Sequence, residues 1–191
     1  QYFAFIDSDD FLNKNYLQVL YGQVKKSHCD IAICSYVMLN EKGAYYLPLN
    51  PNGDDINFDG LYFPQQWVKE FFNRDGMIYT APWCKLFNRK VFNHLYFPSN
   101  VEAADDQFTI WRAYLNATTI AFNNKQVHCY LVNSSSLSHS KVNAYYYGIT
   151  CLEEQMAVFK ASGWNISYMA SLYRQRLQNA YNVSLKRGHL N

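Results

Sequence analysis

The amino-acid sequence predicts an α/β fold in which helices flank a sheet and further helices follow toward the C-terminal end. The first residues, up to about position 40, alternate strand, helix and strand, which is typical of a βαβ unit with parallel strands. A later helical segment opens at Asp105 and Asp106 and is followed by two short apolar segments. Hydrophobic residues make up 49% of the chain and charged residues 17%, so the chain is globular rather than disordered.

The expected elements follow from the spacing of apolar residues. Residues 2–6 form a continuous apolar run, which is typical of a strand buried on both faces. In residues 11–26 the apolar side chains recur at helical spacing, and Asp9 or Asp10 is a natural N-cap for that helix. The other expected elements are a strand at 29–39, a turn-rich region at 40–61 with its strongest turn signal at Asn52-Gly53, a helix at 63–73 with Pro64 near its start, a mixed stretch at 79–97, a helix at 105–115, strands at 118–122 and 127–132, a Ser-rich loop at 134–140, and helices at 142–161 and 166–186 separated by Gly163.

Composition excludes several classes of protein. The longest apolar run is shorter than the roughly 18 residues that a membrane-spanning helix needs. A net charge of +2 gives no electrostatic reason to expect a nucleic-acid partner. The five cysteines are scattered without a C-x-x-C motif, and four of them stand among apolar residues, which indicates reduced core thiols and a cytoplasmic compartment.

Three carboxylates follow the first strand within four residues, as Asp7, Asp9 and Asp10. Ligands of α/β sheets bind at the carboxyl ends of strands, and oxygen-rich sites suit Mg²⁺ or Mn²⁺. The alternative interpretation is structural, with Asp9 and Asp10 as helix caps and Asp7 as a solvated turn residue. A second pair, Asp105 and Asp106, could supply a general base or could simply cap a helix.

Three segments together resemble family-2 glycosyltransferases of the GT-A fold. Residues 3–12 read FAFIDSDDFL and resemble the D-x-D region of that family. Residues 81–89 read APWCKLFNR, resembling its W-x-K-L-[FY]-x-R segment, and are followed by Phe97-Pro98 and by the pair Asp105-Asp106, which stands where the family has E-D. The resemblance covers residues 1 to about 140 and implies a partial GT-A, Rossmann-like mixed sheet.

The resemblance also implies roles for the acids. Asp9 would coordinate a Mn²⁺ or Mg²⁺ ion that bridges the donor diphosphate, and Asp7 would face the ribose or a metal-bound water. Asp106 would be the general base of an inverting transfer. Because Asp105 replaces the family's Glu, either carboxylate of this pair could point at the acceptor. The implied donor is a nucleotide-sugar, UDP-linked, and the implied acceptor a surface glycan or a lipid-linked molecule.

Three further residues are candidates for the same site. Family members often place a metal-binding His after the last strand of the sheet, and His139 stands at that place. Trp83 could stack on a sugar ring of the acceptor, or pack in the core beside Phe87. Lys85 could meet a phosphate. His28, His94, His128 and His189 have no acid at ligand spacing and are interpreted as structural or surface residues.

The organisation of the chain follows from the same resemblance. Residues 1–140 are expected to be the C-terminal part of a glycosyltransferase domain whose nucleotide-binding half is absent, and residues 141–191 a helical extension. Such a piece should be inactive alone and could pair with a second copy of itself. The last helix carries apolar residues at helical spacing, and only basic charges follow Glu154. It could rest peripherally on an anionic membrane, but the pattern favours an apolar face that covers the domain core.

Two other functions are compatible with the sequence. A Mg²⁺-dependent phosphotransferase or hydrolase would use Asp7 as its nucleophile, but it would need a downstream Lys and a second acidic strand end. A non-catalytic carbohydrate-binding or assembly module would need the acids only as caps. Metal-dependent binding of UDP separates these alternatives from sugar transfer.

Overall fold

The computed structural model describes residues 1–40, 42–43, 45–46, 58–99, 105–132 and 144–186. The chain divides into two compact units. Unit 1 comprises Gln1–Tyr96 and Thr109–Ser135 and contains the sheet. Unit 2 comprises Phe97–Phe108 and Ser136–Asn191 and contains the C-terminal helices. The turn signal at Asn52-Gly53 and the Ser-rich loop with His139 lie outside the described residues.

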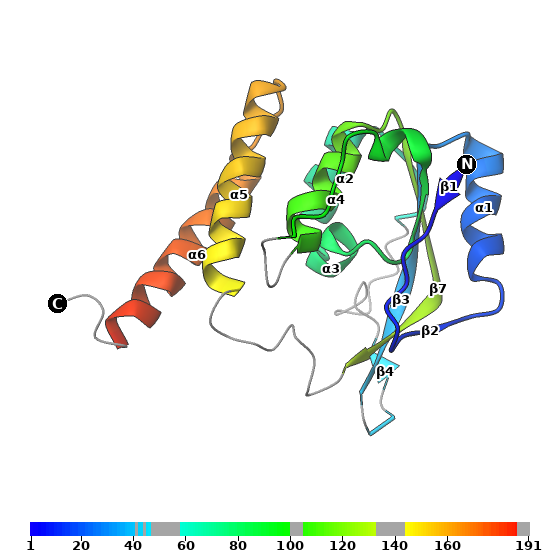
Figure 1. The fold of residues 1–191 in the computed structure, drawn as a ribbon, viewed down its shortest axis with the longest axis horizontal. Helices are drawn as coiled ribbons and strands as arrows, with labels where there is room; N and C mark the ends of the chain where they lie inside the picture. Colours follow the sequence, from blue (N-terminus) through cyan, green and yellow to red (C-terminus); the bar gives the residue numbers. More distant parts are fainter. Residues whose placement is uncertain (41, 44, 47–57, 100–104, 133–143, 187–191) are drawn as a thin grey trace. The chain divides into compact units, whose positions relative to one another are not determined.

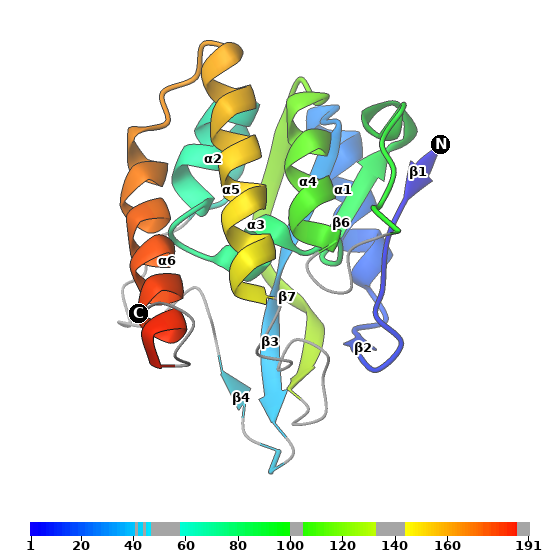
Figure 2. The same cartoon turned by 60° about the vertical axis from the view of Figure 1, so that its left-hand side comes forward.

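The described part of unit 1 is built on a seven-stranded mixed sheet with helices on both faces (Figures 1 and 2). Strands β3 and β7 run parallel at its centre, and the other pairings among the described strands are antiparallel. Helix α1 covers one face, and α2 and α3 cover the other. The path through the sheet is β1 (Tyr2–Phe3), β6 (Lys85–Asn88), β3 (Ile31–Asn40), β7 (Ile120–Val132) and β2 (Phe11–Leu12), with β4 (Tyr45–Tyr46) beside β3 and β5 (Gly60–Tyr62) beside β7. The expected fold class is therefore confirmed.

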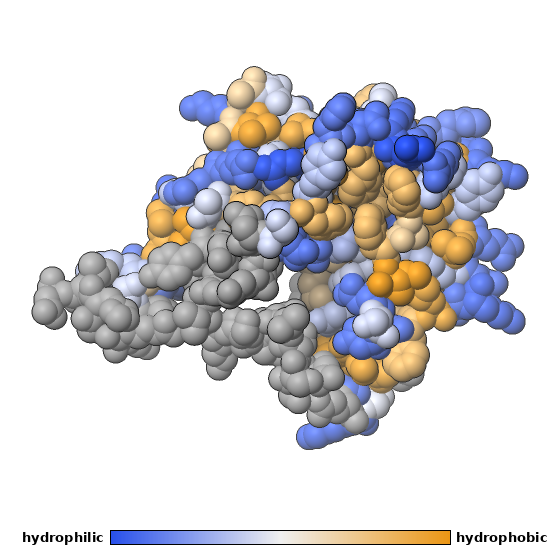
Figure 3. Space-filling view, in the orientation of Figure 1, coloured by the Kyte–Doolittle hydropathy of each residue, from blue (hydrophilic) through white to orange (hydrophobic). Residues whose placement is uncertain are grey.

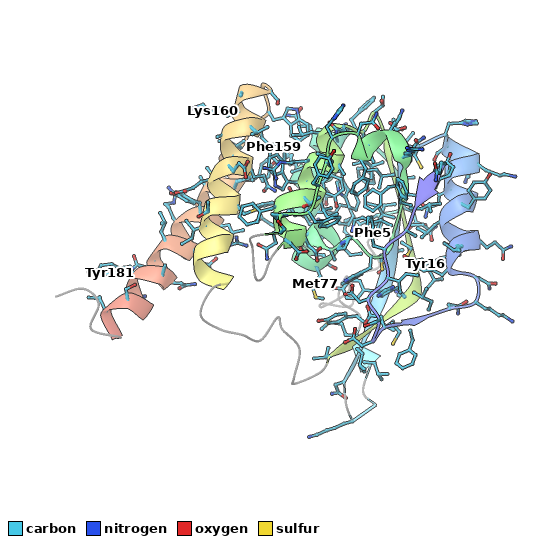
Figure 4. All side chains as sticks on the ribbon, in the orientation of Figure 1. Phe5, Tyr16, Met77, Phe159, Lys160 and Tyr181 are labelled. Atoms are coloured by element: carbon cyan, nitrogen blue, oxygen red, sulfur yellow. The ribbon has the colours of Figure 1, made fainter. Side chains whose placement is uncertain are left out.

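The expected buried strand at residues 2–6 is instead a two-residue strand, β1, at the edge of the sheet. Strand β6 lies between β1 and β3, so β1 has one neighbour, and Tyr2 and Phe3 are each 37% exposed. The chain then leaves the sheet, and Phe5 packs on Phe87 and Phe92 (Figure 4). Apolar surface is visible in Figure 3 where Figure 1 draws the segment between β1 and β2. An apolar run predicts that a strand is buried, but it does not predict which strands become its neighbours in the sheet.

Helix α1 (Tyr16–Ser27) begins later than the spacing predicts. Phe11 and Leu12 form β2, which pairs with Cys129 and His128 of β7, and Asn15 is the N-cap. The prediction that Asp9 or Asp10 caps this helix is therefore wrong. The helix buries Tyr16, Leu20 and Val24 against the sheet and ends where His28 adopts a left-handed conformation.

The two short strands expected at 118–122 and 127–132 form one strand, β7. The polar residues between them belong to an irregularity in the pairing with β3, at Cys34 and Ser35. Asp59 stabilises it by accepting hydrogen bonds from the Asn123 side chain at 3.0 Å and the Asn124 amide at 2.6 Å. A run of polar residues thus marks a bulge within a strand rather than its end.

Helix α2 (Pro64–Phe71) confirms the helix expected at 63–73, with Pro64 in its first turn. Trp67 stacks on Phe71 with ring centroids 3.8 Å apart, and both side chains are fully buried. The mixed stretch that follows contains α3 (Gly76–Thr80), β6 and the 3-10 helix η1 (Arg89–Phe92). Asp75 caps α3, and its burial raises the pKa of the carboxyl group.

Unit 2 contains α5 (Ala144–Ala161) and α6 (Ser167–Lys186), side by side in Figure 2 and close to the bounds expected from the sequence. Gly163 separates them with φ at +77°, a conformation that favours glycine. The first turn of α4 (Asp105–Leu115) also belongs to this unit, because the Cys151 thiol donates to the Gln107 carbonyl at 2.8 Å. Among the described residues no helix is long and apolar enough to cross a bilayer.

Candidate active site

The acidic segment after β1 forms a turn, closed by a 3.2 Å hydrogen bond from the Asp10 amide to the Asp7 carbonyl. We call residues 7–10 the acidic turn. Asp7, Ser8 and Asp9 are exposed, whereas the Asp10 side chain is completely buried. The three carboxylates therefore have different environments, with two at the surface and one in the interior.

The buried carboxylate of Asp10 is held by two residues of β7. The Nε2–H group of His128 donates to one oxygen at 2.7 Å, and the Leu131 amide donates to the other at 3.0 Å. His128 is also completely buried. The interpretation of His128 as a structural residue is therefore confirmed, and it has a partner acid in Asp10. Its partner lies 118 positions away in the chain, which no sequence spacing could reveal.

These hydrogen bonds place the acidic turn at a specific end of the sheet. Leu131 is the last but one residue of β7, which runs parallel to β3. The turn therefore lies near the carboxyl end of this parallel pair, the end at which α/β sheets bind their ligands.

The sequence assigns Asp7 and Asp9 to a divalent cation, and both residues are exposed on the acidic turn. Their carboxylate oxygens are the hard donors that Mg²⁺ and Mn²⁺ prefer, and they project from one exposed turn. Within the described ranges, no group of three or more His, Cys, Asp and Glu residues could hold a metal ion. His139, the third expected ligand, lies outside those ranges.

Asp105 and Asp106 occupy the first turn of α4, where the helix dipole favours negative charge. Both residues are half-buried. The expected start of this helix is confirmed. In unit 2 the turn is anchored to α5 through Gln107 and Cys151, and Arg176 of α6 donates to the Gly148 carbonyl of α5 at 2.6 Å. The two acid pairs belong to different units, the acidic turn to unit 1 and the start of α4 to unit 2.

The structure argues against acceptor contacts by Lys85 and Trp83. The Lys85 ammonium group is completely buried and donates to the carbonyls of Ile78, Ala81 and Trp83 at 2.7, 2.6 and 3.3 Å. Trp83 is 3% exposed, and its indole lies parallel to the His128 ring. Neither side chain has the surface that a phosphate or a sugar ring would need. Both residues are part of the core beside the acidic turn.

Replacing Lys85 with Met should lower the free energy of unfolding by about 2 kcal/mol or more, because three buried carbonyls lose their donor. Urea unfolding of the purified protein measures this effect. Lys69→Met is the matched control, since Lys69 is exposed on α2, and it should change stability by less than about 0.5 kcal/mol. Equal effects of the two substitutions would show that the buried ammonium contributes nothing specific.

Comparison with known proteins places this geometry in context. No family model matches the chain. It is 25% identical to the glycosyltransferase GlyA of Streptococcus pneumoniae, over 98% of this chain and 26% of that protein. It is 29% identical to the glycosyltransferase GlyG of the same organism, over 74% of this chain and 47% of that protein. Its relatives are glycosyltransferases.

Solved structures agree on the fold. The structure of Staphylococcus aureus TarS 1–349 in complex with UDP-GlcNAc matches with a TM-score of 0.63 at 18% identity, over 92% of this chain and 47% of that chain. Curated S. aureus TarS, a poly(ribitol-phosphate) β-N-acetylglucosaminyltransferase, is 25% identical over 68% of this chain. These findings confirm the resemblance to glycosyltransferases and the fold that it implies. The chain spans about a fifth to a half of the length of these relatives.

Proposed function

We propose that this chain forms part of a glycosyltransferase that transfers a hexose-type sugar from a UDP-linked donor to a surface glycan or a lipid-linked acceptor. The observation that carries the proposal is the division of the acidic turn. Asp10 is fixed inside at the carboxyl end of β7, and this leaves Asp7 and Asp9 exposed where a ligand would bind. Relatives named as glycosyltransferases and the TarS complex with UDP-GlcNAc support the assignment.

Asp9, together with Asp7, would hold a Mn²⁺ or Mg²⁺ ion, and His139 remains a proposed further ligand. When bound, such an ion would neutralise the diphosphate of the donor and ease its departure. Asp7 would also orient the ribose or a metal-bound water. The remaining coordination positions would be filled by donor phosphates and water, as is usual for Mg²⁺.

Asp106 would accept the proton of the acceptor hydroxyl as that oxygen attacks the anomeric carbon and the bond to the diphosphate breaks. A sugar hydroxyl is a weak nucleophile until its proton is being removed, and a positioned carboxylate typically contributes about 10² to 10⁴-fold. The position of Asp106 at the start of α4 favours its ionised, proton-accepting form. A single displacement of this kind inverts the anomeric configuration.

A screen of UDP-sugars with the intact protein tests the proposal. We expect release of UDP with one or a few donors, dependent on added Mn²⁺ or Mg²⁺ and accelerated by an acceptor glycan. NMR of the product should show the anomeric configuration opposite to that of the donor. Absence of UDP binding in the presence of metal would contradict the proposal, and UDP release that is insensitive to chelator would contradict its metal-dependent form.

Helix α6 carries an exposed apolar stripe that could contact the membrane in which a lipid-linked acceptor lies. Leu177, Tyr181 and Leu185 recur every four residues and are 41%, 52% and 44% exposed (Figure 4 labels Tyr181), and Arg174 is exposed one turn before them. Met169 on the same helix is completely buried, so part of its apolar surface packs within the fold and part remains outside. We propose that the exposed stripe contacts anionic lipid, where a lipid-linked acceptor resides.

Replacing Leu185 with Ser should weaken binding of the intact protein to phosphatidylglycerol vesicles by about tenfold, because one leucine side chain no longer enters the lipid interface. Co-sedimentation measures the bound fraction. Leu17→Ser is the matched control, since Leu17 is 57% exposed on α1, and it should bind like the unaltered protein. Equal behaviour of both variants would contradict the assignment of α6 to the membrane.

A further inference from the structure

A continuous series of contacts leads from the buried Lys85 to the acidic turn. Lys85 donates to the carbonyls of Ile78, Ala81 and Trp83 and so fixes the backbone that precedes it. This backbone includes Cys84, which has a positive φ of 59°. A non-glycine residue in that conformation needs support from its surroundings, and Lys85 supplies it directly.

The fixed backbone presents the Trp83 indole to β7. The indole lies over His128 with ring centroids 4.8 Å apart and planes within 7°, and over Tyr130 at 5.6 Å and 19°. Tyr36 of β3, which pairs in register with His128, meets the same indole edge-on at 5.0 Å. The imidazole of His128 is therefore confined by aromatic rings, and its direction is set by packing.

His128 in turn determines where the acidic turn lies. Its Nε2–H group points at Asp10, and the Leu131 amide fixes the second carboxylate oxygen. Breaking either bond would leave one oxygen of a buried carboxylate without its donor, which is costly. The position of Asp10 is thus set from the sheet, and Asp7 is joined to it by the hydrogen bond that closes the turn.

We infer that Trp83 and His128 are positioning residues for the acidic turn, acting through Asp10. This inference rests on the proposed function for its catalytic meaning, since it assigns Asp7 and Asp9 to the donor and its metal. It gives the W-C-K segment at residues 83–85 a role that does not require contact with the acceptor. Residues 83–85 lie in the core and fix the position of the turn, whose Asp7 and Asp9 carboxylates are exposed to solvent.

The first test follows the turn itself and needs no activity. In the intact protein, His128→Leu removes the donor to Asp10 but keeps an apolar side chain under Trp83. Amide hydrogen exchange of residues 7–10 should become at least about tenfold faster, and exchange of Leu131 should also accelerate. His128→Gln can still donate from its amide nitrogen and should restore most of the protection. Tyr114→Phe, which removes a buried hydroxyl donor to the Tyr79 carbonyl elsewhere in unit 1, is the control for general destabilisation.

The second test asks whether the position of the turn matters for the donor. His128→Leu should raise the Mn²⁺ concentration needed for half-maximal transfer by roughly 10 to 100-fold. This is the usual effect of losing a residue that does not touch the metal but holds its ligands in position. The maximal rate at saturating metal and donor should change far less. His128→Gln should shift the metal requirement by only a few-fold, and Tyr114→Phe should not shift it.

Unchanged exchange of the acidic turn in folded His128→Leu would overturn the inference, and so would an equal change in Tyr114→Phe. If His128→Leu does not fold, Trp83→Phe is the alternative variant, because it retains an aromatic ring with less contact area. Exchange of the acidic turn should then accelerate by a smaller factor. Unchanged exchange in Trp83→Phe would also overturn the inference. A turn that loosens as expected, in a protein that shows no metal-dependent transfer before substitution, would refute the proposed function and leave the role of His128 in the turn intact.

Discussion

Replacing Asp9 with Asn in the intact protein should lower Mn²⁺-dependent sugar transfer at least about a hundredfold, the scale on which a single charge-stabilising group acts. Asn keeps the size of the side chain and removes its charge. Because Asp9 is exposed, the substitution leaves no buried group without a partner, and the fold should be unaffected. Initial rates at saturating donor, together with circular dichroism, measure the two properties.

Glu70→Gln is the control for the loss of one carboxylate. Glu70 forms an ion pair with Arg74 on the surface of α2, and its loss should cost little in stability and nothing in rate. Full activity of Asp9→Asn at saturating donor would remove Asp9 from the metal site. Loss of folding in Asp9→Asn would assign it a structural role instead.

Replacing Asp106 with Asn should lower turnover by at least about a hundredfold, because the acceptor hydroxyl loses the group that takes its proton. Binding of the UDP-sugar in the presence of metal should stay close to normal, since the general base acts on the acceptor. Calorimetric titration with the donor and steady-state kinetics with donor and acceptor together separate the two effects.

Asp105→Asn is the matched control one residue earlier in the same helical turn. Its loss should cost about 0.3 to 1 kcal/mol of stability through the helix dipole, with little effect on turnover. If the two variants exchange these behaviours, Asp105 is the base. If both retain turnover, the acids at the start of α4 are structural and the proposed proton transfer is wrong.

Helices and the central strand could be predicted from the sequence because their signals are local. Pro64 marks the start of α2, the acids at 105 and 106 mark the start of α4, and Gly163 separates the last two helices. The apolar run of β3 is long and buried, so its bounds were also close. Each of these signals lies within one turn or one strand of the element that it identifies.

The edge strands and the residues around the acidic turn could not be predicted, because distant segments decide them. The insertion of β6 beside β1 turns an apolar run into an exposed edge. Asp10 has the sequence signature of a helix cap but bonds to β7 instead. Lys85 has the signature of a ligand-binding cation, yet three carbonyls nearby in the chain enclose it. The resemblance singles out Asp7 and Asp9, and the structure shows that these two are exposed while Asp10 is buried.

The anchoring of Asp10 has a consequence for the order of events during synthesis. The acidic turn leaves the ribosome before its partners His128 and Leu131, which are made 118 and 121 residues after Asp10. Closing so large a loop is slow and must wait for β7 to join the sheet. Until then the segment with Asp7 and Asp9 lacks the hydrogen bonds from β7 that fix its position. We therefore expect the acidic turn to take up its fixed position only when unit 1 is complete.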